Sequence, residues 1–148
     1  QHYNLSWIAS KTKDVRNIKN KLYIYKKIAR IRVPQKNFSK AYDIINKEKL
    51  KIIYINVINF EVDIFLSQEN FFNILNNIKN KTNIISHDTN LNMLKLNITN
   101  NSKKEELLSQ ILSRITPSKI ILFNSANLNK IIIIYRSSIE KDIFKNIL

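Results

Sequence analysis

Few side chains in this sequence are suited to acid–base or metal chemistry, and those few are scattered. The only histidines are His2 and His87, and His87 is followed directly by Asp88. A metal centre or a nucleophile–base pair needs at least one further partner at a suitable spacing. We find no such partner, interpret His87-Asp88 as a polar turn, and predict no catalytic residue, no metal site and no cofactor.

A second pair of acidic residues lies two positions apart, at Glu61 and Asp63, and alternation along a strand would place both on the same side. Paired carboxylates can do acid–base work, but more often they form the solvent face of a sheet. The chain contains no cysteine and no glycine. This excludes zinc–thiolate sites and glycine-rich phosphate loops, so we expect a protein that is not an enzyme.

Positive charge is concentrated at the N-terminus. Residues 1–37 hold ten Lys or Arg against one Asp, in a chain of net charge +14. Lysines can bind phosphate while tyrosines stack on bases, although a solvated basic surface explains the same pattern. The predicted patch for an anionic partner comprises Lys19, Lys21, Tyr23, Lys26, Lys27, Arg30 and Arg32.

These residues belong to a segment, residues 5–32, that we interpret as one long helix ending before Pro34. Its apolar residues recur at heptad-like positions, which is typical of a coiled-coil seam. A single helix lying on the domain remains the alternative. The predicted partner-binding seam comprises Ile8, Val15, Ile18, Leu22 and Tyr25.

Three units of one helix followed by two strands are predicted next, beginning near Ser39, Ser67 and Ser102. In the second unit, residues 83–86 and 93–98 are expected to form two strands joined by a turn at residues 87–90. The run Ile131–Tyr135 is continuously apolar, which indicates a strand buried on both faces. Because the chain has no glycine, asparagines such as Asn59 and Asn90 should occupy the tight turns.

The predicted fold class is α+β, with about three ferredoxin-like helix–strand–strand units in an antiparallel-rich sheet behind a long N-terminal helix. We expect a basic, possible coiled-coil helix over residues 1–37, a ferredoxin-like domain over 38–137 and a C-terminal helix over 138–148. An apolar fraction of 44% supports a folded chain of this size. The sequence contains no run of 18 apolar residues, so we predict no membrane-spanning helix within it.

The order of elements resembles the type II secretion system protein M and type IV pilus protein O family over residues 5–99. The resemblance is carried by residues 5–10 and 15–18, by Ala41, Ile45 and 50–52, and by 60–64 and 71–75. Membership of that family implies an upstream membrane helix, a periplasmic ferredoxin-like domain, dimerisation and binding to a platform protein of the inner membrane. It implies no catalytic residues.

The expected function is therefore a scaffold subunit of a secretion or pilus platform at the periplasmic face of the inner membrane. Its helix seam and sheet edges would bind protein partners, as a homodimer or a hetero-oligomer, and a segment preceding Gln1 could reach the membrane. The alternative is an RNA-binding structural protein of a mitochondrial-type ribosome, bound to rRNA in the matrix. The many Ile, Asn and Lys residues suggest an AT-rich genome for either function.

Overall fold

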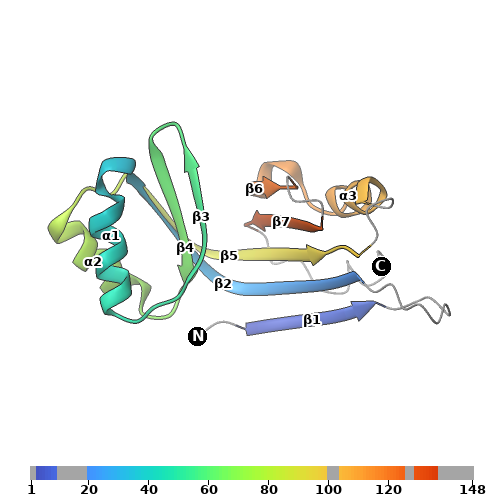
Figure 1. The fold of residues 1–148 in the computed structure, drawn as a ribbon, viewed down its shortest axis with the longest axis horizontal. Helices are drawn as coiled ribbons and strands as arrows, with labels where there is room; N and C mark the ends of the chain where they lie inside the picture. The colour runs from blue at the N-terminus through green and yellow to red at the C-terminus, as the bar shows by residue number, and fades with distance from the viewer. Residues whose placement is uncertain (1–2, 10–19, 100–103, 126–128, 137–148) are drawn as a thin grey trace. The chain divides into compact units, whose positions relative to one another are not determined.

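The computed structural model describes residues 3–9, 20–99, 104–125 and 129–136, and the chain forms two compact units. Unit 1 contains Lys27–Leu91, and unit 2 contains Tyr3–Lys26 together with Asn92–Leu148. Two long strands, β2 (Asn20–Pro34) and β5 (Ser86–Asn97), contribute residues to both units (Figure 1). This division differs from the segments 1–37, 38–137 and 138–148 expected from the sequence.

Unit 1 has the ferredoxin-like order of strands and helices. Its strands are hydrogen-bonded in the order β3-β4-β2-β5, and β4 runs antiparallel to both of its neighbours. Between the two shared strands the chain forms η1 (Gln35–Asn37), α1 (Phe38–Lys47), β3 (Ile52–Ile58), β4 (Glu61–Ser67) and α2 (Phe71–Lys81). The α+β, ferredoxin-like part of the sequence-based prediction is confirmed.

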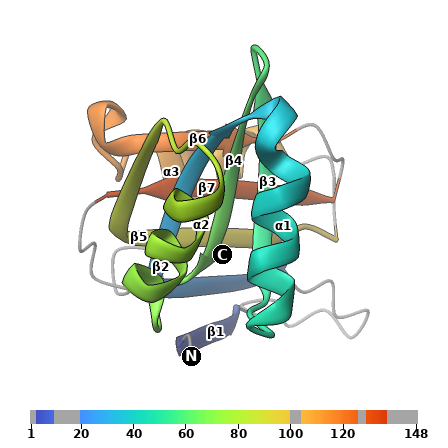
Figure 2. The ribbon, with the colours of Figure 1, turned by 90° about the vertical axis from the view of Figure 1, so that its left-hand side faces the viewer.

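Both helices of unit 1 lie against one face of its strands, in front of them in Figure 2. Ala41, Ile44 and Ile45 form the buried stripe of α1, as their helical spacing predicts. The stripe of α2 comprises Phe71, Ile74, Leu75 and Ile78. Ile31 of β2 and Ile64 of β4 complete this core. The opposite face of the sheet is formed by the residues of β2, β4 and β5 that alternate with these core residues.

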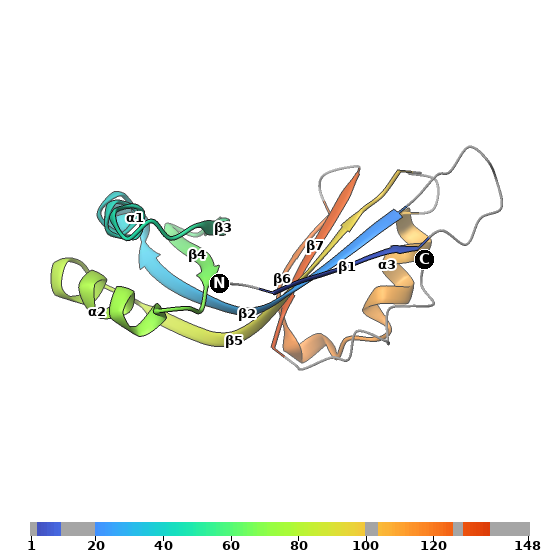
Figure 3. The same ribbon diagram turned by 90° about the horizontal axis from the view of Figure 1, so that it is seen from below.

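Unit 2 is built on the other parts of the shared strands, in the order β1-β2-β5-β7-β6. Its further elements are β1 (Tyr3–Ala9), α3 (Lys104–Leu112), η3 (Pro117–Lys119), β6 (Ile120–Asn124) and β7 (Lys130–Tyr135). Figure 3 shows β2 and β5 running next to each other. β7 lies between β5 and β6, and Ile131, Ile133 and Ile134 are fully buried. The predicted central strand is present.

The long N-terminal helix is a wrong prediction, and so is the coiled coil. Ile8 belongs to β1, and Leu22 and Tyr25 belong to β2, which pairs antiparallel with β1. Val15 and Ile18 lie outside the described residues. The core residues of β2 are Leu22 and Ile24 in its first part and Ala29 and Ile31 in its second part, so core positions change from even to odd numbers along the strand. As a result, Leu22 and Ala29 are both core residues although they are seven positions apart.

Lys27 explains this change of phase in β2. It adopts a left-handed backbone with φ 58° in the middle of the strand. Such a residue interrupts the regular alternation of side chains, as in a β-bulge. The interruption produces a spacing of seven that resembles a heptad.

The hairpin expected at residues 87–90 is also absent, since β5 is a single strand through that stretch. Asn90 nevertheless has the positive φ expected for it, 58°, and Asn59 has φ 49° in the turn between β3 and β4. The predicted C-terminal helix lies outside the described residues. Among the described residues, no helix is long and apolar enough to span a bilayer.

Candidate functional site

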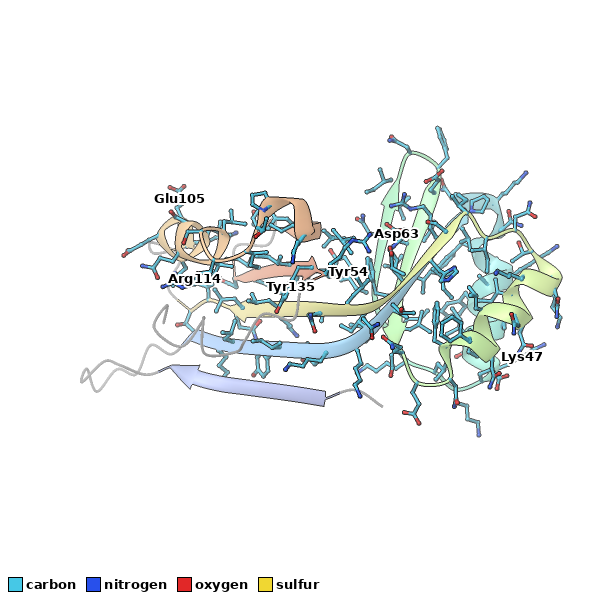
Figure 4. The ribbon with its side chains drawn as sticks, turned by 180° about the vertical axis from the view of Figure 1, so that it is seen from behind. Lys47, Tyr54, Asp63, Glu105, Arg114 and Tyr135 are labelled. Carbon is cyan, nitrogen blue, oxygen red and sulfur yellow. The ribbon has the colours of Figure 1, made fainter. Side chains whose placement is uncertain are left out.

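A buried ionic network lies on the helix-free face of unit 1. Asp63, labelled in Figure 4, projects from β4 opposite Arg32 in the ladder. Arg32 donates from Nε to Asp63 Oδ1 over 2.7 Å and from Nη2 to Oδ2 over 2.9 Å. Arg30 donates from Nη1 to Asp63 Oδ1 over 2.9 Å, and from Nε to Asp88 Oδ2 over 2.9 Å. The network joins three strands.

The charges of this network neutralise one another. Only 6% of Arg30 and 4% of Asp63 are exposed. The hydrogen bond with Asp63 raises the pKa of the Arg32 guanidinium, which keeps it charged. The network therefore connects the three strands through buried side chains, and the sequence-based interpretation of Asp63 as a solvent-facing residue is wrong.

The predicted anionic-partner patch is divided by the structure. Arg30 and Arg32 are held by carboxylates, whereas Lys21, Lys26 and Lys27 are exposed. Tyr23 is half-buried, with Lys95 Nζ 5.9 Å from its ring centre. Lys19 lies outside the described residues.

The predicted partner-binding seam is also divided. Leu22 is buried in the core of unit 2, while Tyr25 is half-buried and has a pKa raised by that burial. The role predicted for these residues stays a prediction.

The histidine singled out in the sequence lies on β5, beside aromatic rings of α2. The ring of His87 is 5.9 Å from that of Phe71 and 6.4 Å from that of Phe72, measured between centroids. Within the described ranges, no group of three His, Cys, Asp or Glu side chains is placed to hold a metal ion.

An open cavity of about 660 Å³ lies at the surface where β2 passes into α1. It is lined by Pro34, Gln35, Lys36 and Phe60. The Gln35 N–H donates to the Phe60 carbonyl over 2.8 Å, which holds the β3–β4 turn against this corner. The volume is within the range of small-molecule sites.

Phe60 is an unusual residue for its position. Asn59 and Phe60 form the two-residue turn between β3 and β4, and both have positive φ, 49° and 65°. Such turns normally carry Asn-Gly, because a side chain in the left-handed region costs about 1–2 kcal/mol. Phe60 is also 84% exposed. A strained, exposed aromatic residue beside a cavity is a typical feature of a ligand site.

Sequence reasoning predicted this turn from Asn59 but missed the role of Phe60. The available signal was a bulky aromatic residue in the position where a glycine usually follows asparagine.

The outer strand of unit 1 is β3, which is paired only with β4 among the described strands. Its sequence, Ile52–Ile58, contains no charged residue and no proline. Ile55, Val57 and Ile58 are exposed, Val57 by 57%. An uncharged apolar edge is the kind of strand that pairs with another chain.

Comparison with known proteins identifies solved structures that share this fold. No protein-family model matches the sequence, and no curated protein sequence matches it. Aspartate kinase of Clostridium acetobutylicum is similar in structure, with TM-score 0.67 and 12% identity over 85% of this chain and 33% of that one. The regulatory subunit of aspartate kinase from Thermus flavus has TM-score 0.63 and 6% identity, over 85% and 94%.

A third similar structure is E. coli aspartokinase III in complex with lysine and aspartate, with TM-score 0.60 and 11% identity, over 85% of this chain and 31% of that one. The chain thus spans about one third of the two whole enzymes and nearly all of the regulatory subunit. At these identities the similarity concerns the fold.

These similarities correct the sequence-based expectations of identity. The resemblance to type II secretion protein M and pilus protein O is wrong, because the similar structures described above are an aspartate kinase, an aspartokinase and a regulatory subunit of aspartate kinase. The secretion-scaffold function and the alternative of an RNA-binding ribosomal protein are wrong on the same finding. Their locations, the periplasmic face of the inner membrane and the mitochondrial matrix, are wrong with them. No similarity supports a membrane or rRNA partner.

Proposed function

We propose that this chain is a non-catalytic regulatory domain that binds a small carboxylate-bearing ligand, of the amino-acid class, in the cavity beside Phe60. The observation that carries the proposal is the strained, exposed Phe60, which lines the same cavity as Lys36. The phenyl ring offers an apolar wall, and the exposed Lys36 ammonium offers a charge for a carboxylate. Gln35 adds an amide that can donate or accept.

The comparisons support the class of ligand. One similar protein is a regulatory subunit, and another was solved with lysine and aspartate. This chain, with its ferredoxin-like unit 1, covers 94% of that regulatory subunit.

Thermal unfolding in the presence of single amino acids tests this proposal. A ligand that binds only the folded state at about 100 times its Kd adds about 2.7 kcal/mol, which raises Tm by several degrees. We expect one or a few amino acids to do so. Lys36→Gln should raise the ligand concentration needed for the same increase in Tm about tenfold. Lys40→Gln, the same substitution at an exposed residue of α1, should leave that concentration unchanged. Equal loss in both variants would contradict the assignment of Lys36.

We also propose that the chain self-associates through the β3 edge. Antiparallel pairing of β3 with a second copy joins two identical uncharged strands, which avoids opposing like charges in a chain of net charge +14. Val57→Lys should convert a dimer into a monomer in light scattering, and Ile85→Lys, an equally polar change away from β3, should not. A parent chain that is monomeric at high concentration would refute this pairing.

A further inference from the structure

Asn37 directly precedes α1, but its side chain does not cap that helix. At a usual N-cap the backbone lies in the β region, and an asparagine side chain there accepts a hydrogen bond from an amide of the first turn. Asn37 has φ −100° and ψ −2°, because η1 leads directly into α1, and its side chain makes no bond to the amides of α1. The side-chain amide is therefore available for a contact outside its own helix.

That contact is with Thr82, the residue at the end of α2. Asn37 Nδ2 donates to Thr82 Oγ1, and both residues are half-buried. Thr82 is itself held by α2, since its N–H donates to the Ile78 carbonyl over 2.8 Å and Ile78 is fully buried. Figure 2 shows α1 and α2 side by side. The start of α1 is thus bonded to the end of the neighbouring helix.

A second bond joins the segment after α2 to the other side of the cavity. The Ile85 N–H donates to the Arg32 carbonyl over 2.8 Å. Arg32 comes two positions before the cavity residues 34–36, and Asn37 comes directly after them. The segment after α2 therefore holds the backbone of the cavity residues on both sides.

The Asn37 amide also has a cost. Its Oδ1 atom is buried and has no hydrogen-bond partner among the described residues. A buried acceptor without a donor lowers the stability of the folded state. Proteins accept such costs chiefly at functional sites, which is consistent with a task for Asn37 at the adjoining cavity.

We infer that Asn37 is a positioning residue of the cavity: its bond to Thr82 fixes the backbone at Lys36, and so the place from which the Lys36 ammonium reaches a ligand carboxylate. The inference rests on the ligand site proposed above. Asn37 does not line the cavity, so its effect on a ligand passes through its neighbour Lys36. Without the bond, Lys36 samples more positions, and holding it in one of them costs binding free energy.

Calorimetric titration with the common amino acids tests this role. For each amino acid that binds the parent chain, we expect Asn37→Ala to raise Kd about tenfold, as Lys36→Gln should. Because Asn37 acts through Lys36, the variant that carries both substitutions should also show an increase of about tenfold. Two independent contributions would multiply to about a hundredfold.

Substitutions of Thr82 test the same bond from its other end. Thr82→Val keeps the shape of the side chain but removes the hydroxyl, and it should raise Kd as much as Asn37→Ala does. Thr82→Ser keeps the hydroxyl and should bind like the parent chain. Asn46→Ala, the same substitution at an exposed asparagine of α1, should leave Kd unchanged. Circular dichroism confirms that each variant is folded, and the two Thr82 variants decide the question if Asn37→Ala does not fold.

Three results would overturn the role of Asn37 and leave the ligand site standing. They are parent-like binding by Asn37→Ala, an increase of about a hundredfold in the double variant, and equal binding by Thr82→Val and Thr82→Ser. A parent chain that binds none of the amino acids would instead overturn the ligand site itself, and the inference with it.

Discussion

Replacement of Asp63 by alanine is expected to lower the free energy of unfolding by about 3–5 kcal/mol. Asp63 is the shared partner of Arg30 and Arg32, at 2.7–2.9 Å. Its loss leaves Arg30, only 6% exposed, with half of its neutralising charge. Removing one member of a buried ion pair costs more than the pair contributes, because the remaining charge has been taken out of water. Urea unfolding followed by circular dichroism measures the change.

Asp43→Ala is the matched control for this prediction, because Asp43 is an exposed aspartate on α1. It should change the free energy of unfolding by no more than about 0.5 kcal/mol. Asp63→Asn should lie between the two, since the amide oxygen still accepts one hydrogen bond. Similar losses in Asp63→Ala and Asp43→Ala would show that the network contributes no more than an ordinary surface charge.

Replacement of Phe60 by glycine is expected to separate stability from ligand binding. The left-handed conformation of Phe60 costs the folded state about 1–2 kcal/mol, and glycine removes this cost. Glycine also loses more conformational entropy on folding, which costs about 0.5–1 kcal/mol. The net expectation is a gain of several tenths of a kcal/mol to about 1 kcal/mol in the free energy of unfolding. Loss of the ring should weaken binding of the ligand about tenfold or more.

Phe60→Ala is the comparison that makes this result interpretable. Alanine lacks the ring but keeps the Cβ that makes the left-handed conformation costly, so binding should fall without the gain in stability. Chemical unfolding and ligand titration of both variants give the two quantities. If Phe60→Gly unfolds at lower denaturant concentration than Phe60→Ala, the backbone strain assigned to Phe60 is wrong.

Local patterns predicted α1 and β4 of unit 1 and β7 of unit 2. Helical spacing of Ala41, Ile44 and Ile45 identified α1, and the alternation from Phe60 to Leu66 identified β4. The continuous run Ile131–Tyr135 identified a central strand, because a strand buried on both faces has no polar positions. These features depend on short-range periodicity.

The two shared strands could not be predicted in the same way. In β2 the left-handed Lys27 interrupts the alternation and produces a spacing of seven between Leu22 and Ala29, which imitates a heptad. In β5 the polar run His87–Asn90 resembles a turn, but Asp88 is drawn into the sheet by Arg30 from β2. A partner 58 positions away in the sequence leaves no local signal.

The pairing of the arginines in the basic segment could not be predicted, for a related reason. Counting charges by segment cannot reveal that Arg30 and Arg32 are neutralised by Asp63 and Asp88, because these acids come from β4 and β5. The cavity was missed because it is formed by the end of β2 and the turn after β3, which the fold brings together. Only the unusual Asn59-Phe60 turn could have indicated it.

The most direct test of the central claim is a calorimetric titration of the parent chain with the common amino acids and small carboxylates. The account predicts saturable heat for at least one of them, with Kd of about 1 mM or tighter, and loss of that heat in Phe60→Ala. No saturable heat for any of them, or unchanged binding in Phe60→Ala, would contradict a ligand-binding regulatory domain with its site beside Phe60.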